Sequence, residues 1–266
     1  MNRKIVDESE ICELYLHGKS FTDIKKEIGV SQSSARRILV CNGIEIRSKS
    51  VPRSKLKCCS LDLNFFKKID SHEKAYWLGV IVSDGTIQKD GYKVSLTSKN
   101  IDLIRKFKKA IKSSHKITPI NSFDKRTKKT YSRFIIQIGS KDLVSDIIKL
   151  GITNKKSYTC EFPKIEEKYY LSFLRGLFDG DGSLTVKSKE NYRMSFTATR
   201  EIINFIQIFL KEKHNIEPHP IYVTSTNMNV CRTHYFSDTK KILSLLYENS
   251  NKNSRLNRKY KLYIYG

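Results

Sequence analysis

The chain has 266 residues, 39% of them hydrophobic, and it carries 50 lysine and arginine residues against 27 acidic ones. This length suits one double-sized domain with a small appendage. The formal net charge of +23 indicates a polyanionic partner. Because the basic residues follow both helical and strand patterns instead of one amphipathic stripe, we expect nucleic acid and not a membrane surface.

The search for targeting segments and the spacing of the cysteines exclude several classes of protein. No apolar run is long enough to span a bilayer, and residues 1–9 lack the apolar core of a signal peptide. We therefore expect an intracellular protein, cytoplasmic or organellar. The six cysteines include no CxxC pair, so neither a zinc site nor a disulfide framework is expected.

Residues 1–43 predict three short helices, over Glu8–Leu16, Phe21–Ile28 and Gln32–Cys41. The aliphatic spacing is typical of a helix-turn-helix, although Lys25 stands where a small residue is usual. On this hypothesis the side chains that could reach a DNA groove are Gln32, Ser33, Arg36 and Arg37. A plain three-helix packing module is the alternative.

Residues 44–60 predict a linker that carries few large apolar groups and several basic ones, including Arg47, Lys49 and Arg53. A solvated tether is the default interpretation of such a charge run. Beside a DNA-binding module, an extended basic arm that lies in a groove fits equally well.

The rest of the chain contains an internal duplication. Residues 76–85 read YWLGVIVSDG and residues 173–182 read FLRGLFDGDG, which aligns Gly79 with Gly176 and Asp84 with Asp181. Residues 91–98 (GYKVSLTS) match residues 191–198 (NYRMSFTA) in the same way. Each copy continues with a helix, two strands and a further helix. We therefore predict an α+β fold of two pseudo-symmetric αββαββα repeats, residues 61–160 and 161–266, each with a four-stranded antiparallel sheet open on one face.

Each copy places an aspartate and a glycine at the end of a predicted helix. Glycine is a common helix terminator, but the carbonyl end of the helix dipole repels a carboxylate. For a single copy a turn would explain the pattern. Two helix ends side by side would gather Asp84 and Asp181 with backbone oxygens into a nest that suits Mg²⁺. The predicted metal ligands are Asp84, Asp181, Ser83 and Gly180.

Small residues at four-residue spacing allow these two helices to approach closely. Gly79 and Ser83 share one stripe of the first helix, and Gly176 and Gly180 share one stripe of the second. Helix backbones that pack through such stripes lie at the short end of the usual interaxial range. The duplication and the stripes together favour a paired site over two unrelated turns.

The paired segments resemble the motifs of the LAGLIDADG homing endonucleases, in the single-chain form with two repeats. The resemblance covers roughly residues 61–262 and includes the stretches LGITNKKSYTCEFPKI and RLNRKYKL. The first motif departs from the pattern at Val82, where the second has Asp179. The resemblance implies a saddle that straddles DNA, with the motif helices between the repeats and with Asp84 and Asp181 as metal ligands.

The implied activity is sequence-specific cleavage of both DNA strands across the minor groove of a long, asymmetric site. Metals would stabilise the attacking water and the leaving oxygen. Mg²⁺ or Mn²⁺ is the expected cofactor, with Ca²⁺ as a non-cleaving substitute. The resemblance also implies a basic residue near each scissile phosphate, for which Lys156 and Lys259 are the candidates by position.

The expected partner is double-stranded DNA, bound by a monomer, with no small-molecule substrate. Two alternatives remain open on the same fold: a DNA-binding regulator that does not cleave, and an RNA maturase. The two helix-end aspartates count against the regulator, because a protein without cleavage has no reason to keep them.

Side chains on the open sheet faces are the candidates for reading the DNA sequence. Val94 and Leu96 must face the helices, so the alternate positions face away from them. The candidates in the first repeat are Thr86, Gln88, Lys93, Ser95, Thr97, Arg133 and Gln137. Those in the second are Ser183, Thr185, Lys187, Arg193, Ser195, Thr197, Arg232 and His234. An ordinary solvated face is the alternative, against which the lack of acidic residues on these strands argues.

Overall fold

The computed structural model describes residues 7–46, 59–124, 127–188, 191–224 and 227–265. The chain divides into two compact units, Met1–Cys58 and Cys59–Gly266. Three residues of the expected basic arm, Arg47, Lys49 and Arg53, lie outside the described residues.

The N-terminal unit is formed by three helices, α1 (Glu8–Leu16), α2 (Phe21–Ile28) and α3 (Gln32–Cys41). Ser20 caps α2 in a capping box with Asp23, and Ser31 caps α3. Gly29 ends α2 at a φ of +80°, a left-handed conformation that glycine adopts without steric cost. The fully buried side chains of this unit are Ile11, Ile24, Ala35 and Leu39.

The C-terminal unit contains two αββαββα repeats, as predicted. The first has α4 (His72–Asp84), β1 (Gly85–Ile87), β2 (Lys93–Ser98), α5 (Ile101–Ala110), β3 (Ile117–Asp124), β4 (Lys129–Gly139) and α6 (Lys141–Lys149). The second has α8 (Tyr170–Asp181), β5 (Ser183–Ser188), β6 (Asn191–Thr199), α9 (Arg200–His214), β7 (Ile221–Thr224), β8 (Asn227–Tyr235) and α10 (Thr239–Glu248). The antiparallel sheets have the equivalent orders β1-β2-β4-β3 and β5-β6-β8-β7.

Short elements that the repeat pattern does not predict follow each copy. The first repeat is followed by α7 (Lys156–Thr159) and the 3-10 helix η2 (Glu167–Tyr169), and the second by α11 (Asn257–Tyr265). The segments that contain α7 and α11 return to the ends of α4 and α8, where they contribute to the candidate site.

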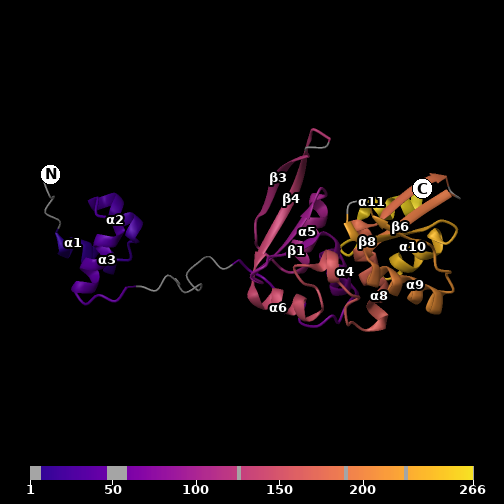
Figure 1. Ribbon diagram of the computed structural model, residues 1–266, viewed down its shortest axis with the longest axis horizontal. Coiled ribbons are helices and arrows are strands. Elements are labelled where there is room, and N and C mark those ends of the chain that lie inside the picture. The colour runs from indigo at the N-terminus through magenta and orange to yellow at the C-terminus, as the bar shows by residue number, and fades with distance from the viewer. Residues whose placement is uncertain (1–6, 47–58, 125–126, 189–190, 225–226, 266) are drawn as a thin grey trace. The chain divides into compact units, whose positions relative to one another are not determined.

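The helices α4 and α8 lie between the two sheets (Figure 1). Val94, Leu96, Ile136 and Ile138 face the helices and are almost completely buried, whereas the alternate positions of β2 and β4 face the opposite side. This alternation confirms one covered and one open face for the first sheet. Among the described residues, no helix has the length and apolar character needed to cross a membrane.

Candidate functional site

The α4–α8 contact brings two helix backbones together at glycine. A Cβ atom added at Gly79 would lie 2.1 Å from the carbonyl oxygen of Phe173, and one at Gly176 would lie 2.0 Å from that of Tyr76. One turn further along, a Cβ at Gly180 would lie 1.9 Å from Ser83 Oγ. The predicted small-residue stripes are therefore the interface, and only glycine fits at its closest points.

Both motif helices end without the left-handed turn that a terminal glycine usually adopts. Gly85 has φ −77° and ψ 156°, and Gly182 has φ −74° and ψ 160°, so each helix passes directly into an extended strand. Glycine is required there for another reason. A Cβ at Gly85 would lie 2.5 Å from the carbonyl oxygen of Ile81, and one at Gly182 would lie 2.6 Å from that of Phe178.

Asp84 and Asp181 stand at the adjoining ends of these helices. Asp84 is half-buried, and Asp181 reaches the surface. Loss of surrounding water, followed by the negative charge of Asp181, raises the pKa of Asp84 to about 6. Loss of water also raises the pKa of Asp181. The surroundings of both carboxylates thus disfavour the ionised form. Carboxylates with such shifted pKa values are common at functional sites.

Lys156 satisfies the carbonyl end of α4. Its ammonium donates to the carbonyl oxygen of Val82, and to that of Ser83 at 2.7 Å. Burial lowers the pKa of this lysine, while the charges of Asp181 and Asp84 act in the opposite direction. The cation therefore offsets both the helix dipole and part of the carboxylate repulsion.

Lys259 does the same for α8. It donates to the carbonyl oxygens of Phe178, of Asp179 at 3.1 Å and of Gly182 at 2.6 Å. Its side chain is almost fully buried, and this burial lowers its pKa to about 8. The two lysines proposed from sequence position thus occupy equivalent places, one at the carbonyl end of each motif helix.

The donor set suits a hard cation. Among the described residues, no three histidine, cysteine or acidic side chains gather into a metal cluster. The oxygen ligands would be the two carboxylates, nearby carbonyl groups and water. Mg²⁺ commonly takes only one or two carboxylates and keeps several waters. The Ser83 carbonyl oxygen, a predicted ligand, already accepts a hydrogen bond from Lys156, so it would have to serve both cations.

Each carboxylate also has an arginine within electrostatic range. Arg133 from β4 acts to lower the pKa of Asp84, and Arg232 from β8 acts to lower that of Asp181. The guanidinium of Arg232 is held by a 3.0 Å hydrogen bond from Nε to Thr197 Oγ1. Sequence pattern assigned both arginines to base contacts, whereas their position beside the carboxylates suits a phosphate as well.

A buried polar network that sequence reasoning missed supports the second motif helix. Asp179, 3% exposed, accepts hydrogen bonds from Tyr76 Oη at 3.0 Å, Tyr247 Oη at 3.4 Å and the Leu256 amide at 2.6 Å. The fully buried Arg175 donates to backbone carbonyls, among them that of Leu246 at 2.6 Å. The network ties α8 to α4 and to the segment that carries Lys259. Its sequence signal is an arginine and an aspartate within an apolar helix.

The open sheet faces carry the predicted candidates, with one exception. Ser195 is fully buried, and its hydroxyl lies 2.7 Å from that of Ser183. The structure therefore corrects its assignment as a direct contact. The candidates classed as exposed are Thr86, Gln88, Arg133, Gln137, Ser183, Thr185, Lys187, Arg193 and Arg232. Those that are half-buried are Lys93, Ser95, Thr97, Thr197 and His234.

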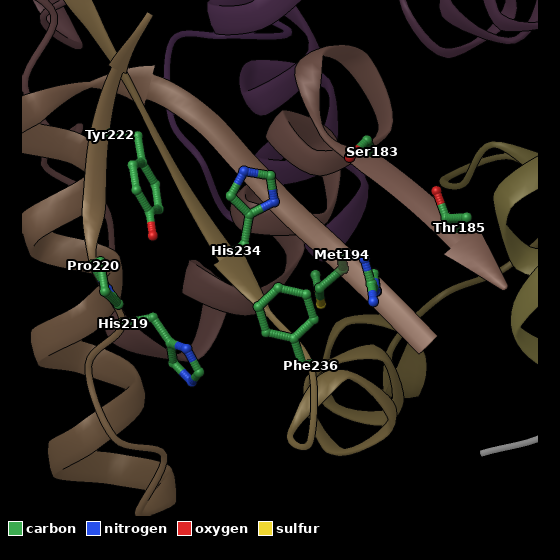
Figure 2. A pocket seen from close by; sticks show the side chains of 9 residues that line it. Ser183, Thr185, Met194, His219, Pro220, Tyr222, His234 and Phe236 are labelled. Carbon is green, nitrogen blue, oxygen red and sulfur yellow. The ribbon is translucent and has the colours of Figure 1, made fainter. Parts of the chain in front are cut away.

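The open face of the second sheet also contains a pocket. Its rim and floor include Ser183, Thr185, Arg193, Met194, Tyr222, His234 and Phe236. Figure 2 shows the rings of Tyr222, His234 and Phe236 along this hollow. Tyr222, Met194 and Phe236 were not among the predicted residues, because no local pattern distinguishes them from core positions.

In the N-terminal unit, α3 presents its polar side to solvent. Gln32, Ser33, Arg36 and Arg37 are all exposed. Gln32 Nε2 donates to Thr22 Oγ1 at 3.3 Å, which links the start of α3 to α2. The four predicted side chains are therefore free of the unit's apolar core.

Two family models match the C-terminal unit. The WhiA LAGLIDADG-like domain matches residues 73–162, and the LAGLIDADG-like domain matches residues 168–235. Together these ranges cover more than half of the chain and correspond to the two repeats.

Two proteins of Methanocaldococcus jannaschii are similar in sequence. An uncharacterized protein is 28% identical over 201 residues, which are 72% of this chain and 71% of that protein. The replication factor C small subunit is 28% identical over 197 residues, which are 68% of this chain and 10% of that protein. This chain thus corresponds to only a small part of the second relative.

One solved structure shares the fold, and a second matches more weakly. The homing endonuclease I-WcaI bound to its DNA recognition sequence matches with a TM-score of 0.55 and 15% identity, over 84% of this chain and 96% of that one. Full-length WhiA from Thermatoga maritima matches with a TM-score of 0.45 and 18% identity, over 76% and 66%. Given the two matching family models and the two motif helices that meet at glycine, the chain belongs to the LAGLIDADG family.

Proposed function

We propose that this protein is a sequence-specific, divalent-metal-dependent DNA endonuclease of the homing-endonuclease kind. The observation that carries the proposal is the pair Asp84 and Asp181 at the adjoining carbonyl ends of two helices. The helix dipoles and mutual repulsion both disfavour this placement, and neither carboxylate is used in the packing network. A bound cation would turn the same arrangement into a favourable one.

The proposed chemistry is hydrolysis of one phosphodiester in each strand. Mg²⁺ at this site would act as a Lewis acid on the phosphate and lower the pKa of its bound water. Asp84 and Asp181 would hold the cation. Lys156 and Lys259, at the carbonyl ends of α4 and α8, would place positive charge near the phosphate on which negative charge develops.

The proposed substrate is double-stranded DNA, cut across the minor groove. A net charge of +23 and the basic open sheet faces support an extended contact with phosphates and base edges. The two faces differ in sequence, so the recognised site should be long and asymmetric. One chain supplies both aspartates, so we propose that the protein acts as a monomer. Arg36 and Arg37 of the N-terminal helix-turn-helix would add a contact outside the cleavage site.

Cleavage selection from a library of randomised duplex DNA tests the proposal. The full-length protein with Mg²⁺ should release double-strand ends that define one long, asymmetric site. The control is Asp84→Asn combined with Asp181→Asn, together with wild-type protein in excess chelator; neither should release ends. Selective binding without cleavage in Mg²⁺ or Mn²⁺ would overturn the proposal.

That outcome would favour a second candidate, a DNA-binding protein that does not cleave. The observation that favours it is the match of residues 73–162 to the WhiA LAGLIDADG-like domain model. Both candidates use the same DNA-binding faces, so the selection distinguishes them by cleavage alone.

A further inference from the structure

The second sheet has an aromatic pocket on its open face. The pocket has a volume of about 480 Å³. Tyr222 and Phe236, which line it, remain 56% and 49% exposed. Among the residues that the structure describes, no acidic side chain lines it. A concave apolar surface with a basic rim is typical of a binding site for an anionic partner that carries apolar groups.

Ring contacts hold the pocket walls in place (Figure 2). The His234 and Phe236 rings stack with an interplanar angle of 13° and centroids 6.4 Å apart. Tyr222 meets His234 edge-on at 5.9 Å. The Arg193 guanidinium lies 5.3 Å from the Phe236 centroid, a cation–π distance that restrains the arginine. The apolar surface and the hydrogen-bond donor are therefore preorganised beside one another.

The first sheet carries non-aromatic residues at the equivalent positions. Ser95 pairs with Gln137 and Lys93 with Gly139, whereas Ser195 pairs with His234. The register therefore places Gln137 where the second sheet has His234, and Gly139 where it has Phe236. On the outer strands, Thr118 pairs with Ile135 and Tyr222 with Arg232, which places Thr118 where the second sheet has Tyr222. This group of aromatic side chains is thus specific to the second sheet at these positions.

We propose that this pocket receives the 5-methyl group of a thymine in the major groove of the half-site that faces the second repeat. The proposal rests on the proposed DNA binding and names the group that is read. The thymine methyl is the apolar group on the major-groove edges of the four base pairs. In this arrangement Tyr222 and Phe236 cover the methyl, and Arg193 donates to an acceptor of the neighbouring base.

Deoxyuridine scanning tests this proposal, because uracil differs from thymine only by the missing methyl. Each thymine of the selected site is replaced in turn, and the dissociation constant for the full-length protein is measured in Ca²⁺. We expect about four-fold weaker binding at one or two thymines of one half-site, the effect of failing to bury one methyl group. The half that faces the second repeat is the one where Arg232→Ala alters base preference.

Two sets of variants assign the effect to the pocket. Phe236→Ala and Tyr222→Thr, the latter giving the residue of the first sheet, should bind thymine and uracil duplexes equally. Thr118→Ala and Gln137→Ala occupy the matched positions of the first sheet and should leave the discrimination intact. All four variants should retain the wild-type circular dichroism spectrum. If Phe236→Ala or Tyr222→Thr does not, Phe236→Leu takes its place and should reduce the discrimination.

The outcomes separate this proposal from the proposed nuclease function. Three results would overturn the methyl pocket and leave the proposed cleavage unaffected. Uracil could be tolerated at every position, the effect could be confined to the half that faces the first repeat, or the discrimination could survive in Phe236→Ala. A rise in the fluorescence of 2-aminopurine placed as the adenine that pairs with the affected thymine would indicate an unstacked base pair and would also overturn the methyl pocket. Discrimination by a protein that binds but does not cleave would support the pocket and reject the nuclease. Absence of selective DNA binding would overturn both.

Discussion

Alanine at Gly79 tests the helix contact on which the site depends. The added Cβ would lie 2.1 Å from the Phe173 carbonyl oxygen and 2.9 Å from the Leu177 nitrogen. These are backbone atoms that cannot rotate away, so restoring a contact near about 3.5 Å requires the helices to separate by more than about 1 Å. By helix propensity alone, alanine would be about 1 kcal/mol more favourable than glycine. We expect instead a loss of about 3 kcal/mol in the free energy of unfolding, the upper part of the usual overpacking range.

Urea unfolding of the full-length protein, followed by tryptophan fluorescence, measures this loss. The chain has one tryptophan, Trp77, which is fully buried on α4 and so reports on the C-terminal unit. Gly139→Ala is the matched control, because its Cβ would meet nothing within 4 Å; its effect should stay within about 0.5 kcal/mol. Wild-type stability in Gly79→Ala would refute the backbone contact between α4 and α8.

Three further perturbations test the site and its surroundings. Asp179→Ala leaves three buried donors unsatisfied and should cost about 3 kcal/mol or more in the same unfolding assay; a loss below about 1 kcal/mol would contradict the network. In chelator, the raised pKa of Asp84, about 6, means that the native state binds the proton more tightly than the unfolded state. The contribution of Asp84 to the unfolding free energy should therefore fall by at most about 3 kcal/mol as pH rises from about 4 to 6, and Asp84→Asn should reduce the slope; an unchanged slope in that variant would reject the assignment. Removing residues 1–58 should shorten the DNA footprint on one side and lower the salt dependence of binding, with cleavage retained; an unchanged footprint and slope would make this unit a structural appendage.

The repeat architecture was predictable from the sequence because duplication supplies an internal comparison. Gly79 and Gly176 could be recognised as an interface since both copies place small residues at the same helical spacing. The strand alternation around Val94 and Leu96 likewise predicts which face is open. These features depend on the local spacing of residues, which can be read from a single sequence.

The polar interior of the site could not be predicted in the same way. Lys156 and Lys259 reach helix ends that lie more than 70 residues away along the chain, and only their resemblance to family stretches identified them. The role of Gly85 in avoiding a backbone clash, and the burial of Ser195, depend on distances that no residue pattern encodes. The sequence alone shows that Asp179 stands where the first repeat has Val82. It does not show the hydrogen-bond partners of Asp179, because they come from three separate segments.

The single variants Asp84→Asn and Asp181→Asn test whether these two aspartates bind the metal for DNA cleavage. Each is incubated with the selected site and Mg²⁺, and binding is measured in parallel without metal. We expect that neither variant makes double-strand breaks, while both bind DNA within a few-fold of the wild-type affinity. Double-strand cutting at the wild-type rate by either variant, or undiminished cutting by the wild-type protein in excess chelator, would contradict it.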